Sequence, residues 1–135
     1  MLIIHPMSPA DAASVFRGLT QNDHMTTAEW QSYCRGKGLL VLVAEQDDEL
    51  VGYAVAQSCP QRVHIRDLVG DTRTGRLLLD RLVMAAGERD LSGWVPADRP
   101  DLRRLFRRRG LVRDGTGYHE GRPAYFYFWD RNKDE

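Results

Sequence analysis

The pattern of hydrophobic and polar positions predicts alternating strands and helices. Short continuous apolar runs are typical of buried strands, whereas apolar residues three and four positions apart mark one face of a helix. Strands are predicted over residues 2–4, 39–44, 50–56, 63–69, 92–96, 111–112 and 125–129. Helices are predicted over residues 8–19, 26–35, 77–86 and 98–109. The order is therefore strand, helix, helix, three strands, helix, strand, helix and two strands.

Local signals support the ends of these elements. Ser8-Pro9-Ala10-Asp11 supplies an N-cap, a proline at the first helical position and an acid three residues on. Asp98 is the expected N-cap of the last helix, and Gly110 is expected to end it. The polar turn over residues 46–49 is so short that the strands on its two sides must be antiparallel neighbours.

Length and composition limit the class of protein. A chain of 135 residues has room for one domain, so residues 1–135 are expected to form a single α/β domain of the α+β kind with a mixed sheet. The 19 Lys and Arg residues balance the 19 Asp and Glu residues, so attraction of the whole molecule to nucleic acid or an anionic membrane is not indicated. Cys34 and Cys59 have no metal-ligand spacing and are expected to be free thiols. With no leader-like or membrane-spanning segment, a cytoplasmic location is expected.

The junction between strand 63–69 and the helix that follows it contains the most informative polar residues. Strict alternation places Val63, Ile65 and Asp67 on one side of the strand and His64, Arg66 and Leu68 on the other. The next seven residues, Gly70-Asp71-Thr72-Arg73-Thr74-Gly75-Arg76, form a polar turn that leads directly into the helix. Amides at a helix N-terminus are unpaired and favour an anion, so this turn is a candidate anion site.

Two segments resemble the GNAT family of acyl-CoA-dependent N-acetyltransferases. The hairpin Leu42–Tyr53 is similar to the family's acidic turn followed by a hydrophobic pair and a glycine. Leu105–Val112 resembles its helix that ends in an aromatic residue, three further residues, a glycine and a hydrophobic residue. The resemblance implies a sheet splayed between the fourth and fifth strands, with the pantetheine arm of acetyl-CoA in the gap and paired with the fourth strand.

In that family, a Gln/Arg-x-x-Gly-x-Gly/Ala turn wraps the cofactor's diphosphate. Here Gly75 matches the last glycine of the motif. Arg73 occupies the position where the motif has its middle glycine, and Gly70 occupies the position of the Gln or Arg. Side chains of Arg73 and Arg76 and the Thr72 and Thr74 hydroxyls could bind the same anion instead of backbone amides. An ordinary capped junction with solvated arginines is the alternative. The resemblance implies these cofactor-binding residues: Leu68, Val69, Gly70, Asp71, Thr72, Arg73, Thr74, Gly75 and Arg76.

Acyl transfer to an amine also needs proton transfer. Phe106 stands where many family members have a tyrosine that protonates the leaving thiolate, and a phenyl ring has no proton to give. Tyr118, Tyr125 or a water molecule could substitute, and the packing of a helix core also explains Phe106. The candidates for the base that deprotonates the amine are Asp67, His64, His119 and Glu120.

A run of arginines follows on the last helix. Arg103 with Arg107, and Arg104 with Arg108, lie four residues apart on its exposed side. A solvated helix face is the expected reading. Nucleic-acid phosphates and the cofactor's adenosine 3′-phosphate are the alternative partners, and net neutrality makes nucleic acid the least favoured.

These features together predict an acyltransferase that moves an acetyl or related group from acetyl-CoA to the amine of a small molecule or peptide. A relative of the fold that has lost catalysis and binds a ligand or a protein is the alternative. Loops 20–26 and 114–123 are expected to line the acceptor side. The aromatic strand 125–129 is expected to be a sheet edge, which suggests pairing into a homodimer.

Overall fold

The fold is known from a computed structural model that describes residues 1–8, 11, 29 and 38–129. The strands are β1 Leu2–Pro6, β2 Leu39–Gln46, β3 Glu49–Ser58, β4 Arg62–Val69, β5 Asp90–Pro96, β6 Val112–His119 and β7 Arg122–Trp129. The helices are α3 Thr72–Ala86 and α4 Pro100–Arg108. Every predicted element from residue 38 onward is present. The two helices expected between residues 8 and 35 lie almost wholly outside the described residues, and so does the expected acceptor loop 20–26.

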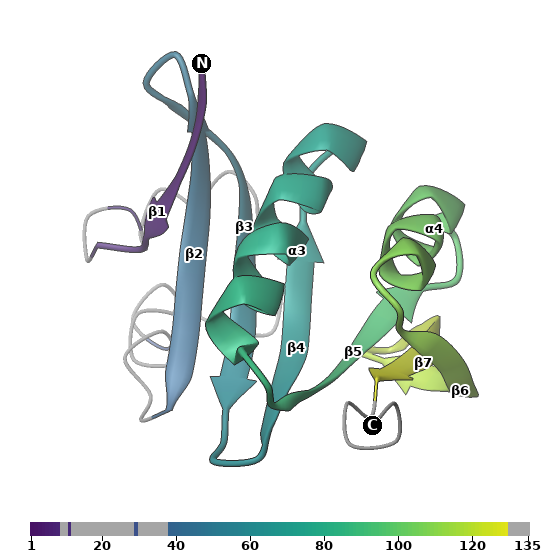
Figure 1. The fold of residues 1–135 in the computed structure, drawn as a ribbon. Coiled ribbons are helices and arrows are strands. Elements are labelled where there is room, and N and C mark those ends of the chain that lie inside the picture. Colours follow the sequence, from purple (N-terminus) through teal and green to yellow (C-terminus); the bar gives the residue numbers. More distant parts are fainter. Residues whose placement is uncertain (9–10, 12–28, 30–37, 130–135) are drawn as a thin grey trace.

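The strands form one sheet in the order β1-β2-β3-β4-β5-β7-β6. All neighbours are antiparallel except β4 and β5, which are parallel. Helix α3 lies across the β2–β4 side of the sheet, and α4 lies over β5 and the β6–β7 hairpin (Figure 1). The mixed α+β architecture predicted from the sequence is therefore confirmed.

One hydrophobic core joins both helices to the sheet. Leu78, Leu79 and Leu82 of α3 are fully buried, because they recur at helical spacing and face the strands. Leu102 and Phe106 of α4 belong to the same core cluster. A Cβ on Gly75 would lie 2.9 Å from Leu102 Cδ2, so this glycine allows α3 and α4 to approach closely.

Two predicted helix starts have different outcomes. Ser8 and Asp11 form the expected capping box, since each backbone amide donates to the other residue's side-chain oxygen at 3.1 Å. The prediction for Asp98 is wrong, because Arg99 occupies the N-cap of α4 and makes no side-chain cap. Pro100 fits the first helical position, where no amide hydrogen is needed.

The C-terminal hairpin differs from the prediction in two ways. Residues 114–119 belong to β6 and residues 122–123 to β7, so the expected loop 114–123 is reduced to the turn at Glu120 and Gly121. Strand β7 pairs with β5 on one side and β6 on the other, so it is not an edge. Pairing of protomers through the aromatic strand therefore loses its basis. Among the described residues, no helix is long and apolar enough to cross a membrane.

Candidate active site

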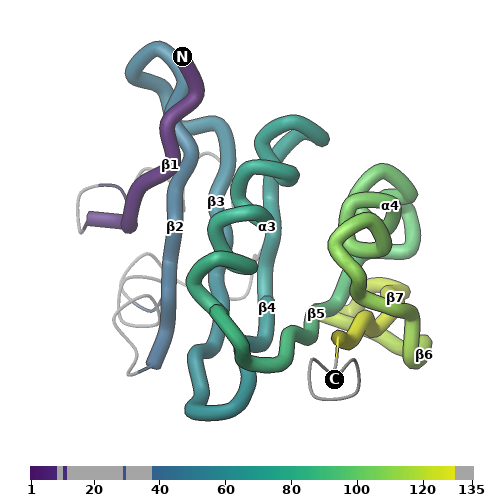
Figure 2. The backbone as a smooth tube through the Cα atoms, in the orientation of Figure 1, coloured from purple at the N-terminus to yellow at the C-terminus, as the bar shows by residue number. Residues whose placement is uncertain are grey.

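The sheet opens between its two parallel strands. The register of β4 with β5 covers only four pairs and ends where Ile65 meets Gly93. Beyond that point, residues 67–69 pair with β3, and residues 94–96 of β5 pair with β7. Figures 1 and 2 show the two strands diverging from a common lower end. The splay that the family resemblance implies is confirmed.

A β-bulge in β4 lies at the point where the strands part. Ala56 pairs with Ile65 and Val55 pairs with Asp67, so Arg66 is the extra residue in the ladder. Strict alternation is lost there, and the prediction that Asp67 lies on the same side as Ile65 is wrong. Asp67 shares its face with Val55, on the side of the sheet opposite the α3 core. The bulge thus moves Asp67 to the side where His64 also lies.

The tip of the β6–β7 hairpin reaches this bulge. His119 Nε2 lies 2.9 Å from the backbone oxygen of Arg66, 3.9 Å from Asp67 Oδ1 and 4.0 Å from Glu120 Oε1. The His119 ring stacks on the Trp94 indole of β5, with centroids 6.3 Å apart and planes 4° from parallel. Asp67, His119 and Glu120, which we call the acidic cluster, are therefore assembled across the gap between β4 and β5.

The pKa values in the acidic cluster are shifted in directions that suit proton transfer. Burial, and then the charge of Asp67, raise the pKa of the Glu120 carboxyl above its ordinary 4.5. The neighbouring Asp67 carboxylate raises the pKa of His119 above 6.5, against the opposing effect of burial. Glu120 therefore holds its proton to a higher pH than a solvated glutamate, and His119 keeps its positive charge to a higher pH.

Glu120 also has an unusual backbone conformation. Its φ is 54°, and Gly121 follows with φ 78°, so the pair forms a two-residue turn with two left-handed positions. Asparagine and glycine are the residues that such turns favour, because a longer side chain is strained there. Backbone strain at a carboxylate that lies beside Asp67 and His119 marks a candidate functional site.

His64 lies on the same side of the sheet as Asp67 and has its own partners. Its Nδ1 is 2.7 Å from the Oγ of Ser92, which is fully buried, and its ring is 6.2 Å from that of Phe126. Burial lowers the pKa of His64 below 6.5, and the nearby Arg62 and Arg66 lower it further. The imidazole is therefore neutral near pH 7 and remains a candidate base.

The candidate acids occupy different surroundings. Tyr118 is 76% exposed and, as the residue before His119 in a strand, points to the opposite face. The structure does not bring it to the acidic cluster. Phe106 is buried against the Tyr127 ring, 5.7 Å away, and close to Gly93 at the fork of the strands. Packing accounts for a phenyl ring at that position.

The N-terminus of α3 is capped by its own acid. The Asp71 carboxylate accepts a hydrogen bond from the Thr74 amide at 2.8 Å, and this bond lowers its pKa below 3.8. The Thr72 hydroxyl donates to Asp101, and Thr74 is only 2% exposed. The expected unpaired amides and hydroxyls are therefore partly engaged, whereas the Arg73 and Arg76 side chains are exposed.

Arg99 holds the junction in place. Its guanidinium donates to the Gly70 backbone oxygen at 2.9 Å and makes a two-bond ion pair with Asp101, at 3.0 and 2.9 Å. This contact ties α4 to the loop before α3 and lowers the pKa of Asp101 well below its ordinary value. The sequence alone does not predict this role for Arg99, because nothing local indicates a contact with a backbone oxygen 29 residues away.

Comparison with known proteins supports the fold. No family model matches the sequence, and no curated protein matches it. An acetyltransferase of the GNAT family from Streptococcus pneumoniae is 18% identical with a TM-score of 0.73, over 96% of this chain and 98% of that one. The Escherichia coli ribosomal-protein-S18-alanine N-acetyltransferase is 17% identical with a TM-score of 0.72, over 95% and 92%.

A third solved structure contains a ligand. An aminoglycoside acetyltransferase in complex with coenzyme A is 18% identical with a TM-score of 0.67, over 98% of this chain and 96% of the other. All three likenesses extend over almost the whole of both chains. The resemblance carried by the hairpin and by the Leu105–Val112 segment is confirmed at the level of three-dimensional structure, and this chain has the fold of the GNAT acetyltransferases.

Proposed function

We propose that this protein transfers an acyl group, acetyl or a close relative, from acyl-CoA to an amine by direct attack in a ternary complex. The observation that carries the proposal is the acidic cluster at the mouth of the β4–β5 gap. A proton acceptor and an opening for an extended ligand are together what amide formation from a thioester requires. The acetyltransferases that share the fold support the same reaction class.

The gap suits the pantetheine arm of acyl-CoA. Residues 67–69 of β4 pair with β3 but have no partner on β5, so that edge can pair with the amides of an extended ligand. Beyond the end of β4, Arg73 and Arg76 lie one turn apart on the exposed side of α3. Their guanidinium groups are the donors that suit a diphosphate. The Asp71 carboxylate opposes this binding without blocking the gap itself.

The bound acyl-CoA would supply the thioester that is attacked. An alkylamine with a pKa of about 10.4 is mostly protonated at pH 7, so it must lose a proton before it can attack. Asp67 and Glu120 are placed to attract the ammonium group and to accept that proton. His119, held on the Arg66 oxygen, keeps the two carboxylates at the gap.

The bonds balance with no further reactant. The amine nitrogen forms a bond to the carbonyl carbon, the carbon–sulfur bond breaks, and the thiolate leaves with the bonding pair. The amine's protons pass to the acidic cluster and then to solvent. A thiol with a pKa near 8.5 is a tolerable leaving group, so a missing tyrosine at Phe106 slows the step by about 10²–10⁴-fold at most.

The amine acceptor is a small molecule or a peptide. The acidic cluster favours a cationic group on the acceptor. The relatives act on acceptors as different as a ribosomal protein and aminoglycosides, judging from their names. The fold alone therefore selects no acceptor.

Thermal unfolding with and without acetyl-CoA tests the binding step. At a hundredfold excess over Kd, a ligand adds about 2.7 kcal/mol to the free energy of unfolding. For a domain of this size, the expected rise in Tm is roughly 5–15 °C. Release of free thiol in the presence of a panel of amines then tests transfer. A Tm that does not rise at millimolar acetyl-CoA would contradict the proposal.

A second function is favoured by the cap on α3. The Asp71 carboxylate occupies the helix N-terminus, and Phe106 supplies no acid, so a non-catalytic ligand-binding or protein-interaction module is the alternative. Binding of acetyl-CoA with no thiol release for any amine, and no hydrolysis above the uncatalysed rate, would favour it.

A further inference from the structure

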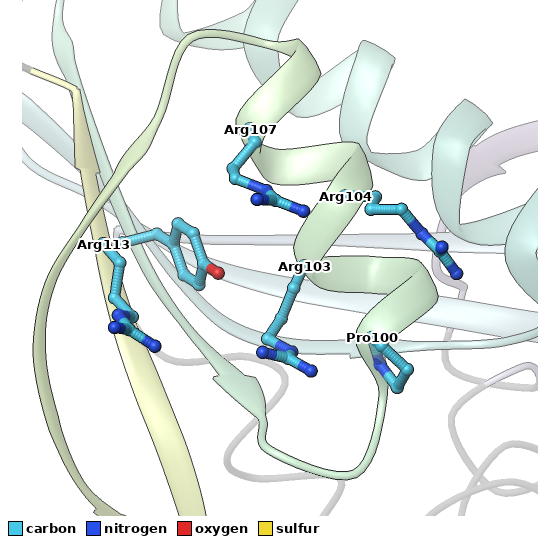
Figure 3. A pocket seen from close by; sticks show the side chains of 6 residues that line it. Pro100, Arg103, Arg104, Arg107 and Arg113 are labelled. Carbon is cyan, nitrogen blue, oxygen red and sulfur yellow. The ribbon is translucent and has the colours of Figure 1, made fainter.

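A cavity lies between α4 and the C-terminal hairpin, apart from the gap between β4 and β5. Its volume is about 360 Å³. The residues that line it are Pro100, Arg103, Arg104, Arg107, Arg113 and Tyr127, and we call the four arginines the arginine pocket. Figure 3 shows Arg103 and Arg107 on the side of the helix toward Arg113 of the hairpin, while the Arg104 side chain extends to the other side of the helix. Every charged side chain that lines the cavity is a cation.

The helical repeat explains why α4 presents this surface. Positions 100, 103, 104 and 107 follow the spacing of one helix face, while Leu102, Leu105 and Phe106 turn toward the core. Arg113 belongs to β6, which β7 separates from β5 in the sheet. The pocket is therefore on the β6 side of α4, whereas the α3 junction is on the other side of that helix (Figure 1).

The arginine pocket lacks internal neutralisation. Arg99 and Arg109, at the two ends of α4, are paired with Asp101 and Asp80. Across residues 1–8, 11, 29 and 38–129, none of the four pocket arginines has a carboxylate within ion-pair distance. Arginine stays charged at any ordinary pH, so their mutual repulsion persists until an anion relieves it.

The Arg103 side chain gives a second indication that an anion binds in this cavity. Its Nε is buried and has no hydrogen-bond partner among the described residues. A buried donor without an acceptor is costly, and such atoms in native proteins call for an explanation such as an absent ligand or ion. An oxyanion in the cavity would accept a hydrogen bond from Arg103 Nε and would also neutralise the positive charge of the arginines.

Two of the guanidinium groups are already positioned. Those of Arg103 and Arg113 lie over the Tyr125 ring, with their central carbons 5.0 and 4.8 Å from its centroid. Rotamers held in this way lose little entropy when a ligand binds. Because the Tyr125 ring is covered by these groups, it is a poor platform for stacking a nucleic-acid base.

We propose that the arginine pocket is a second ligand site, which takes a compact phosphate-bearing small molecule such as a phosphomonoester. Planar guanidinium forks match phosphate oxygens, and a concave site with converging cations suits one compact anion better than an extended polymer. The site is independent of the proposed acyl transfer, since it lies on another face of α4. The ligand is a separate small molecule, distinct from the acyl donor and the amine acceptor.

Equilibrium titration of the whole chain tests the proposal, with inorganic phosphate and O-phosphoserine as probes at constant ionic strength. We expect both to bind, and Arg103→Gln or Arg113→Gln to weaken each by about tenfold or more, as loss of a charge-assisted hydrogen bond implies. Arg108→Gln is the matched control, because this exposed arginine on the same helix lies outside the cavity. It should leave both affinities unchanged.

Acetyl-CoA separates this proposal from the proposed function. Arg113→Gln should leave the rise in Tm with acetyl-CoA unchanged, and failure of acetyl-CoA to bind would leave the phosphate result standing. Equal weakening by Arg108→Gln would overturn the proposal, and so would a single-stranded oligonucleotide that binds far more tightly than either probe. Loss of acetyl-CoA binding in Arg113→Gln would assign the pocket to the acyl donor and also overturn it.

Discussion

The His119 imidazole lies 2.9 Å from the backbone oxygen of Arg66, a residue 53 positions earlier in the chain. This contact joins the tip of the β6–β7 hairpin to the bulge of β4, at the place where β4 leaves β5. The bulge turns Asp67 toward the hairpin, and the hairpin turn brings Glu120 to Asp67. The bulge therefore accounts for the position of Asp67, and the hairpin turn for that of Glu120.

The first prediction separates stability from activity at Glu120. Asn-Gly is the preferred pair for a turn with two left-handed residues, and Glu120 also repels Asp67. Glu120→Asn should therefore raise the stability by about 0.5–1 kcal/mol, while lowering the rate of transfer by about 10²–10⁴-fold. Denaturant unfolding and thiol release measure the two effects. A variant that is stabilised but fully active would remove Glu120 from the mechanism.

The second prediction concerns the charge at the start of α3. Asp71→Asn keeps a side-chain cap but removes the negative charge. For charges about 6 Å apart in water, the loss of repulsion should tighten acetyl-CoA binding by about threefold. Arg73→Gln should weaken it by a similar factor. Titration calorimetry at low salt measures both affinities. Weaker binding in Asp71→Asn together with tighter binding in Arg73→Gln would show that the diphosphate lies elsewhere.

The third prediction tests the packing behind the junction. A Cβ on Gly52 would lie 2.6 Å from the Val69 backbone oxygen and 2.6 Å from Thr74 Cγ2. Because a backbone oxygen cannot swing aside, Gly52→Ala should cost about 1–3 kcal/mol. Gly115→Ala is the control, since nothing lies within 4 Å of its Cβ position. Denaturant midpoints of the two variants should differ clearly, and equal midpoints would contradict this packing.

The fourth prediction follows the charge on His119. The nearby Asp67 carboxylate raises the pKa of its imidazole above 6.5 in the folded protein, so its contribution to stability is complete below pH 6.5. That contribution is lost as pH rises through the folded-state pKa. The loss of Tm between pH 6 and pH 9 should therefore be smaller in His119→Gln than in the parent protein. Identical pH profiles would show that His119 is not held by the carboxylates.

Much of the fold could be predicted because its signals are local. Continuous apolar runs indicated β2 and β3, and the turn of Asp47 and Asp48 between them made them antiparallel. Leu102, Leu105 and Phe106 indicated the buried side of α4. Strand β6 is predicted only at residues 111–112, because its later side chains are mostly exposed and only their backbone pairing with β7 makes them part of a strand.

The site was harder to predict because it depends on contacts between distant residues. The candidates Asp67, His119 and Glu120 were named from chemistry, but a period-two pattern placed Asp67 on the wrong face. A bulge is set by how β3 pairs with β4, and no residue near Arg66 signals it. The same applies to Arg99, whose partner at Gly70 is close only in the folded chain.

Amide hydrogen exchange in the presence of coenzyme A tests the central claim most directly. If the pantetheine arm pairs with β4 beyond the bulge, peptides covering Asp67 to Val69 should become several-fold slower to exchange, while β1 and β2 are unaffected. Binding that leaves these amides unchanged, or protection confined to another surface, would contradict an acyl-CoA site between β4 and β5.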